Sequence, residues 1–265
     1  GVDNATGPRL PLVLIPTTAG TGSEVTPIAI LTIGQNEKRG VSSAVILPDV
    51  AILDPLLTTS LPASITAATG IDAMVHAIEG YASRGANNNP ISKILATQAL
   101  SLLGANIELA VTDGTNIKAR GAMLLGSMLA GMAFANSPVA AVHALAYPIG
   151  GAFHVPHGLS NALVLPHVLR FNAPKAAQEY AELAPFIFPD IDTTQSSQEV
   201  CAEFIERMAT LSATVGLQQK LREVGITADD LPAMASDAMQ QTRLLVNNPR
   251  KITEQDALAI YQAAW

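Results

Sequence analysis

The chain has 265 residues, of which 49% are hydrophobic and 14% charged, a composition typical of a globular protein that buries a full core. Its 22 acidic and 15 basic residues give a formal net charge of -7, which repels phosphate backbones and argues against a nucleic-acid partner. The longest nearly apolar stretch, residues 121–135, is shorter than the roughly 20 residues that span a bilayer, and no signal peptide is visible, so we expect a cytoplasmic protein with no membrane partner.

The first sixty residues have the pattern of β-strands. Short β-branched and apolar runs at residues 12–15, 28–31 and 50–53 alternate with Gly, Pro and Thr turns. Three such runs are too few for a complete sheet, because long edges and one face would stay uncovered. We therefore interpret residues 1–60 as the end of an α/β domain.

From residue 61 onward the pattern lengthens into helices with recognisable starts. The predicted N-terminal caps are Asn89, Asn116, Thr227 and Thr253, and the helices that follow are expected to end near residues 103, 135, 239 and 265. A few strands followed by roughly 200 residues of helix predict a mainly α protein. We expect an all-helical domain over residues 61–265, preceded by a few strands.

A cluster of histidines gives the first indication of chemistry. All five lie between residues 76 and 167, and four of them fall within 25 residues. Asp72 and His76 are four residues apart, so on a helix both project from one face and could bind one metal ion. The alternative is an ordinary Asp/His pair on a helix surface. Apolar neighbours favour burial, and a buried Asp or His has to be paired or metal-bound.

The second histidine-bearing segment is residues 142–158. A helix is expected to end in its Pro/Gly-rich part and a new helix to begin after His157, so the loop can bring His143 and His157 to one point. Three imidazoles and one carboxylate suit Fe(II) or Zn(II) and leave room for a substrate oxygen. His154 is either an acid/base group that lines the site or a plain loop histidine. We interpret His167 as a structural or supporting residue.

Several motifs resemble the iron-containing (group III, iron-activated) alcohol dehydrogenase family, across essentially the whole chain. They are PTTAGTGSEVT at residues 16–26, GIDAMVHAIEG at 70–80, the segment 143–158, and the C-terminal segments 248–250 and 261–265. The resemblance implies a metal-dependent alcohol dehydrogenase that transfers hydride between a small alcohol or aldehyde and NAD or NADP. Fe(II), with Zn(II) as the alternative, would polarise the substrate oxygen. It also implies a homo-oligomer.

The same resemblance assigns roles to individual residues. The metal ligands would be Asp72, His76, His143 and His157. The residues expected to line the cofactor are Thr17, Thr18, Thr21, Lys38 and Leu57, with Lys38 near the nicotinamide ribose and Leu57 near the adenine.

The chain departs from the family pattern in two respects. Many members carry a further histidine four residues after the third ligand, where this sequence has Tyr147, so Tyr147 or His154 is expected to move protons instead. The family's Gly-Gly-Gly-Ser phosphate-binding turn would precede residue 1 and is not found in this sequence. We therefore expect residues 1–60 to be only the C-terminal part of an α/β dinucleotide-binding domain.

Two other functions compete with this interpretation. A metal-dependent hydrolase could use the same ligand set to ionise water, but the His-Glu-x-x-His motif is missing and Glu79 is expected to point away from His76. The rival from another class is a catalytically inactive metal-binding or oligomerising fragment of such an enzyme.

Overall fold

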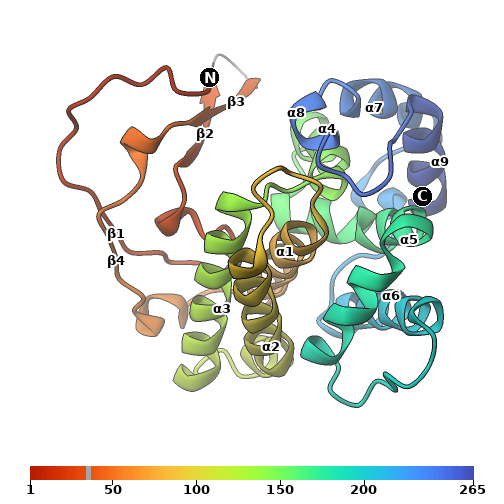
Figure 1. Cartoon of the computed structure of the whole chain (residues 1–265), viewed down its shortest axis with the longest axis horizontal. Helices are drawn as coiled ribbons and strands as arrows, with labels where there is room; N and C mark the ends of the chain where they lie inside the picture. Colours follow the sequence, from red (N-terminus) through yellow and green to blue (C-terminus); the bar gives the residue numbers. More distant parts are fainter. Residues whose placement is uncertain (34–36) are drawn as a thin grey trace.

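The computed structural model describes residues 1–33 and 37–265, and the side chains of residues 32–39 lie outside this description (Figure 1). Within these ranges every strand lies before residue 52, and the long helices begin at Ala63. The predicted mainly α fold is confirmed, since a few short strands precede a large body of packed helices.

The strands form two separate pairs. β1 (Val13–Leu14) pairs in parallel with β4 (Val50–Ala51), and β2 (Ile28–Ile33) pairs with β3 (Glu37–Ser42) in an antiparallel ladder. Three of these strands were expected. β3 was not, because its sequence EKRGVS is charged and lacks the β-branched pattern of a strand. The short 3-10 helices η1 (Ser23–Val25) and η2 (Ala44–Ile46) lie between strands, and η3 (Pro55–Thr58) lies between β4 and the first long helix.

α1 (Ala63–Ala82) lies at the centre of the helical part, and nearly all of it is buried. It packs against α2 (Pro90–Thr112), α3 (Ile117–Asn136) and α5 (His157–Ile187). The other helices are α4 (Ala141–Phe153), α6 (Ser197–Thr214), α7 (Leu231–Ala238), α8 (Thr242–Leu245) and α9 (Glu254–Ala264), with η4 (Leu221–Val224) and η5 (Ala228–Asp230) before α7.

Close approach between α1 and α5 depends on one glycine. A Cβ at Gly158 would clash with the carbonyl oxygen of Ala68, so only glycine lets the first turn of α5 lie this near to α1. The same ideal Cβ would lie 3.3 Å from Cβ of Asp72. The contact therefore brings the start of α5 to the side of α1 that carries Asp72.

The helix starts follow the predicted caps. The side chains of Asn89, Asn116 and Thr253 each accept a backbone hydrogen bond from the first turn of α2, α3 and α9. Thr227 forms a capping box with Asp230 at η5, directly before α7. α2 was expected to end near residue 103 but continues to Thr112, since Leu103, Ile107 and Ala110 extend its buried face.

The expected end of the helix after His143 was wrong. α4 continues through Pro148 and two glycines to Phe153, and the chain turns only at residues 154–156. Pro148 and Ile149 are buried in the core, so tertiary packing outweighs the cost of a proline inside the helix.

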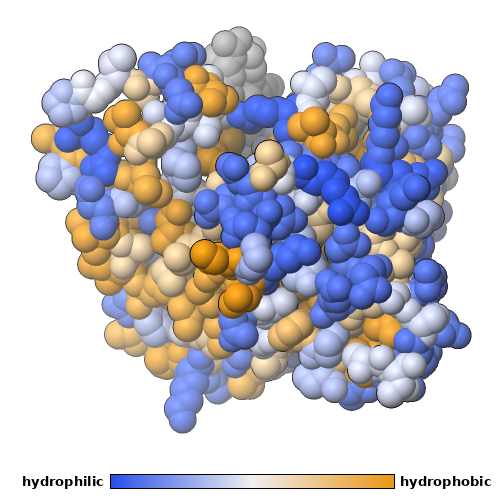
Figure 2. Space-filling model, viewed as in Figure 1, coloured by the Kyte–Doolittle hydropathy of each residue, from blue (hydrophilic) through white to orange (hydrophobic). Residues whose placement is uncertain are grey.

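Exposed apolar side chains are concentrated in the part of the chain before α1. Figure 2 shows hydrophobic residues gathered on the side that carries β1, β4 and α3. Examples are Val13, Ile15, Val50 and Ile52, which are all between 45% and 49% exposed. Parallel strands are normally covered on both faces, so this surface has the character of an interface.

One helix, α2, is long and apolar enough to cross a membrane by length and composition. The apolar stretch at residues 121–135, which falls in α3, does not meet these criteria by itself. In the structure α2 packs against α1, α3 and α5.

A buried amide pair ties the C-terminal part to α5. Nδ2 of Asn172 donates to Oδ1 of Asn248 at 3.0 Å, and Nδ2 of Asn248 donates to Oδ1 of Asn172 at 2.7 Å and to the carbonyl oxygen of Arg250. Arg250 in turn donates to the carbonyl oxygen of Phe171 and stacks on its ring. These contacts hold the segment before α9 against α5.

We expect Asn248→Ala to lower the free energy of unfolding by about 2 to 3 kcal/mol, because it leaves the buried amide of Asn172 without its partner. Asn136→Ala is the matched control, since the exposed Asn136 bonds only within its own helix, and its effect should stay below about 0.5 kcal/mol. Urea unfolding followed by circular dichroism measures both values. Equal effects would contradict a structural role for the amide pair.

Candidate metal centre

Asp72 and His76 lie on the same face of α1, one turn apart, and both are buried. Asp72 is 2% exposed and His76 is 5% exposed. This burial excludes the alternative of an ordinary pair on a helix surface. A carboxylate and an imidazole at this depth need partners inside the protein.

His143 joins the pair from the first turn of α4. Its Nε2 lies 3.1 Å from Nε2 of His76 and 4.0 Å from Oδ1 of Asp72. One ligand atom from each of the three buried residues lies within 4.8 Å of the others, a spacing at which they could hold one metal ion. The structure thus brings together three of the four predicted ligands most closely.

The partners of the two imidazoles determine which nitrogens carry hydrogen. Nδ1 of His76 lies 3.2 Å from the carbonyl oxygen of Gly20, and Nδ1 of His143 lies 2.7 Å from Oε2 of Glu79. A carbonyl oxygen and a carboxylate only accept, so both Nδ1 atoms donate and both Nε2 lone pairs are directed at each other. At 3.1 Å a positive charge, either a proton or a metal ion, has to lie between them.

The pKa values of the two histidines differ. Burial lowers the pKa of His76 to about 3, so this imidazole is neutral. Burial also acts to lower the pKa of His143, but the hydrogen bond and charge of Glu79, together with Asp72, outweigh it and raise that pKa. An imidazole binds a divalent ion in its neutral form, so a metal ion would compete with a proton for Nε2 of His143.

His157 reaches the cluster from the first residue of α5. Its Nε2 lies 3.7 Å from Oδ1 of Asp72, and its ring centroid is 5.4 Å from that of His143. Its side chain is 44% exposed, so it faces the solvent side of the cluster. The fourth predicted ligand therefore lies beside Asp72 but outside the buried triplet.

Asn161, one turn further along α5, is a site residue that the sequence did not indicate. Its Nδ2 donates to Oδ1 of Asp72 at 2.6 Å and lies 3.3 to 3.4 Å from Nε2 of His157 and His143. Burial acts to raise the pKa of Asp72, but the charges of the three histidines and the Asn161 hydrogen bond lower it overall. The histidines therefore account for most of the lowering, and the Asn161 hydrogen bond adds a smaller part.

Glu79 is the other residue that sequence reasoning missed. It was expected to point away from the site, yet its buried carboxylate bonds to His143 and to two backbone amides of α4. No spacing rule could predict this contact, because α4 reaches Glu79 only through the tertiary packing of α1 and α4. The donor set of one carboxylate and three imidazoles, with charged and carbonyl acceptors behind it, fits a divalent ion.

Of the two residues expected to move protons, Tyr147 lies near the cluster and His154 lies exposed at the end of α4. The Tyr147 ring centroid is 6.2 Å from that of His157, and burial raises the pKa of Tyr147, an effect that Arg243 partly offsets. His154 ends α4 in a left-handed backbone conformation and is exposed. In the described part of the chain no hydrogen bond or ring contact joins His154 to the cluster.

The threonine-rich segment docks onto the helices next to the cluster. Gly22, at φ +57°, lies so close to Gly131 of α3 that a Cβ there would be 2.6 Å from the Gly131 Cα. Gly20 packs on Thr69 of α1 and supplies the carbonyl oxygen that orients His76. A loop that contains bends and is followed by η1 carries the threonines.

The predicted cofactor residues lie on the outside of this segment. Thr17 and Thr21 are exposed and Thr18 is half-buried, while Leu57 is 44% exposed in η3. The side chain of Lys38 lies outside the described residues, although its backbone belongs to β3. These positions stay predictions.

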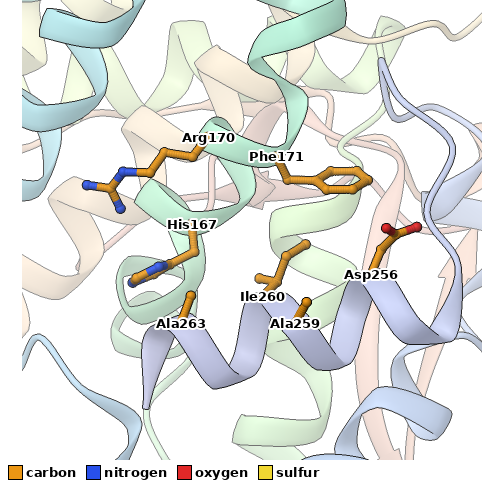
Figure 3. A pocket seen from close by; sticks show the side chains of 7 residues that line it. All are labelled: His167, Arg170, Phe171, Asp256, Ala259, Ile260 and Ala263. Atoms are coloured by element: carbon orange, nitrogen blue, oxygen red, sulfur yellow. The ribbon is translucent and has the colours of Figure 1, made fainter.

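His167 does not belong to the cluster. It lines a separate pocket of about 190 Å³ between α5 and α9, opposite Asp256 and Ile260 (Figure 3). Burial, with the nearby charges of Arg170 and Lys220, lowers the pKa of His167 to about 4. The pocket shares no lining residue with the cluster. The histidines that are close together in the sequence therefore lie at two different places in the structure.

The chain matches a known protein family over most of its length. Residues 66–265 match the family described as "Fe-containing alcohol dehydrogenase family, C-terminal", and residues 1–55 match "Iron-containing alcohol dehydrogenase". Long-chain-alcohol dehydrogenase 1 from Geobacillus thermodenitrificans is 42% identical over 268 residues, which cover 99% of this chain and 67% of the relative.

Two solved structures share the fold. A 1,3-propanediol oxidoreductase superposes with a TM-score of 0.95 at 39% identity, covering 100% of this chain and 69% of that one. A sulfoacetaldehyde reductase from Bifidobacterium kashiwanohense, in complex with NAD+, gives a TM-score of 0.84 at 31% identity, covering 97% of this chain and 65% of that one. With its family match over most of its length and these relatives, the chain belongs to the iron-containing alcohol dehydrogenase family.

Proposed function

We propose that this chain is a metal-dependent alcohol dehydrogenase whose single divalent ion is held by Asp72, His76, His143 and His157. The observation that carries the proposal is the pair of Nε2 atoms of His76 and His143, 3.1 Å apart, with both Nδ1 atoms already engaged. A third buried ligand, Asp72, supplies the negative charge that a cation there requires.

When bound, the ion supplies a Lewis acid beside the substrate oxygen, and the nicotinamide supplies the hydride acceptor or donor. The chain's own residues orient the metal ligands and leave room for the substrate. Gly20 and Glu79 fix the orientation of the two buried imidazoles, and Asn161 fixes the Asp72 carboxylate. The buried triplet excludes water on one side, while the more exposed His157 leaves the other side open to a small alcohol or aldehyde.

Iron is the metal that we propose, and zinc is the alternative. The family is described as iron-containing. Imidazole and carboxylate ligands without a thiolate suit Fe(II) and also Zn(II), so the donor set by itself accepts either ion. Metal analysis of the purified protein distinguishes them.

NAD is the cofactor that we propose, with NADP as the alternative. The related sulfoacetaldehyde reductase was solved with NAD+. In this chain Thr17, Thr18 and Thr21 lie on the loop whose Gly20 carbonyl contacts His76, so a dinucleotide bound along the loop would end near the metal site. We assign Lys38 and Leu57 to the same cofactor on the family resemblance.

Proton transfer is assigned to Tyr147 and His154. The Tyr147 ring is near His157 on the more exposed side of the cluster, where a substrate proton would leave. His154 is exposed at the end of the same helix, which makes it the more distant of the two candidates.

The wider organisation is proposed on the same basis. Residues 1–60 would be the C-terminal part of the cofactor domain and residues 61–265 the helical metal-binding domain. A homo-oligomer would cover part of the apolar surface around β1 and β4, which is more exposed than a parallel pair of strands usually is.

His143→Ala is expected to lower the metal content at least about tenfold, because loss of one ligand leaves the ion under-coordinated and lets water compete. His167→Ala is the matched control, since it removes an imidazole from the separate pocket between α5 and α9. Elemental analysis after dialysis against limiting metal measures both. Equal metal content in the wild type and His143→Ala would refute the ligand assignment.

With metal bound and NAD at millimolar concentration, we expect slow, alcohol-dependent formation of NADH that is lost in His143→Ala. High NAD is used because three threonine hydroxyls contribute only about 0.5 to 1.5 kcal/mol each to binding the dinucleotide. Absorbance at the NADH band measures turnover, with NADP as the comparison. Metal binding without any turnover would support the inactive-fragment alternative instead.

A further inference from the structure

The first turn of α4 lacks a cap from its own segment of the chain. Its N-cap residue, Ala140, has no side chain that can accept a hydrogen bond. The first amides of a helix otherwise have no partner, and buried amides without one are costly. Here the carboxylate of Glu79, from α1, accepts from the Ala140 amide at 3.0 Å and from the Val142 amide at 2.7 Å.

The same carboxylate also meets the imidazole that follows these amides. Oε2 of Glu79 accepts from Nδ1 of His143 at 2.7 Å, and Glu79 is 6% exposed. One buried group therefore fixes where α4 begins, how the His143 ring is oriented and which of its nitrogens carries hydrogen. Its negative charge also lies at the positive end of the α4 dipole.

The linker before α4 is held to α1 by a further contact. Oγ of Ser137 donates to the carbonyl oxygen of Gly80 at 2.6 Å. Gly80 directly follows Glu79 in the sequence. α4 thus begins at a place dictated by two consecutive residues of α1. His76 and Glu79 lie about one turn apart on α1. Because Glu79 holds His143, this one turn sets the distance between His143 and His76.

We propose that Glu79 is a positioning residue for metal binding: it holds His143 in the Nδ1-H tautomer, so that Nε2 is directed at His76 and Asp72. The inference rests on the proposed metal site. Without an acceptor at Nδ1, the hydrogen moves to Nε2 in a fraction of molecules, and that nitrogen no longer offers a lone pair to the ion.

Two substitutions separate this role from a plain packing role. Glu79→Leu keeps most of the volume but removes every acceptor, and we expect the metal dissociation constant to rise roughly 10- to 100-fold. Glu79→Gln can place its amide oxygen between Ala140 and His143, which keeps the acceptor at Nδ1, so its loss should be several-fold smaller. Glu182→Leu is the matched control, because Glu182 accepts from Tyr81 near the end of α1 and touches no ligand.

The tautomer itself is read from the nitrogen-15 NMR shifts of His143 in the metal-free protein, at a pH where the ring is neutral. We expect hydrogen on Nδ1 in the wild type and Glu79→Gln, and a shift toward Nε2 in Glu79→Leu. Hydrogen on Nε2 in the wild type would overturn the inference even if Glu79→Leu does not fold. Equal metal affinity in a folded Glu79→Leu would overturn it as well, whereas a wild type that binds no metal would refute the proposed function instead.

Discussion

Two buried imidazole nitrogens that face each other at 3.1 Å are the constraint on which the site depends. Nε2 of His76 and Nε2 of His143 both present a lone pair, since each Nδ1 donates to an oxygen that can only accept. Such a pair is unfavourable inside a protein unless a cation separates it, and the Asp72 carboxylate beside it favours that cation further. A core with a purely structural role would not need these buried polar groups.

Two separate segments of the chain keep the two imidazoles in place. The Gly20 carbonyl that orients His76 comes from the loop before η1, and the Glu79 carboxylate that orients His143 comes from α1. Close packing of small residues makes these approaches possible, with Gly158 against Ala68 and Gly22 against Gly131. The proposed metal site therefore does not depend on the helical part alone, because the segment before α1 supplies the hydrogen-bond acceptor of His76.

Much of this could be predicted from local sequence. The caps at Asn89, Asn116 and Thr253 act through residues two or three positions away, and the i,i+4 spacing of Asp72 and His76 depends only on helix geometry. Local patterns failed where tertiary packing decides. α4 continues through Pro148 because that residue is buried, and β3 forms from a charged segment because β2 pairs with it.

The supporting residues of the site were the hardest to predict. Asn161 contacts Asp72 and His143, which lie 89 and 18 residues away, and Glu79 contacts His143, which lies 64 residues away. Only the contact between Asn161 and His157 follows a local spacing, because these two residues are four apart on α5. His167 was interpreted from the sequence as a structural or supporting residue, and it lines a separate pocket although it lies close to His157 in the sequence. His157 and His167 lie ten residues apart on α5, so about 15 Å of helix separates them.

The most direct test of the metal centre is anomalous X-ray diffraction from crystals of the Fe(II)- or Zn(II)-loaded protein, measured at the absorption edge of the metal. The proposed metal centre predicts one strong anomalous peak within about 2.0 to 2.2 Å of Oδ1 of Asp72 and of Nε2 of His76 and His143. His157 should complete the coordination from the exposed side. A peak elsewhere, for example in the pocket beside His167, or no peak in a metal-loaded crystal, would contradict it.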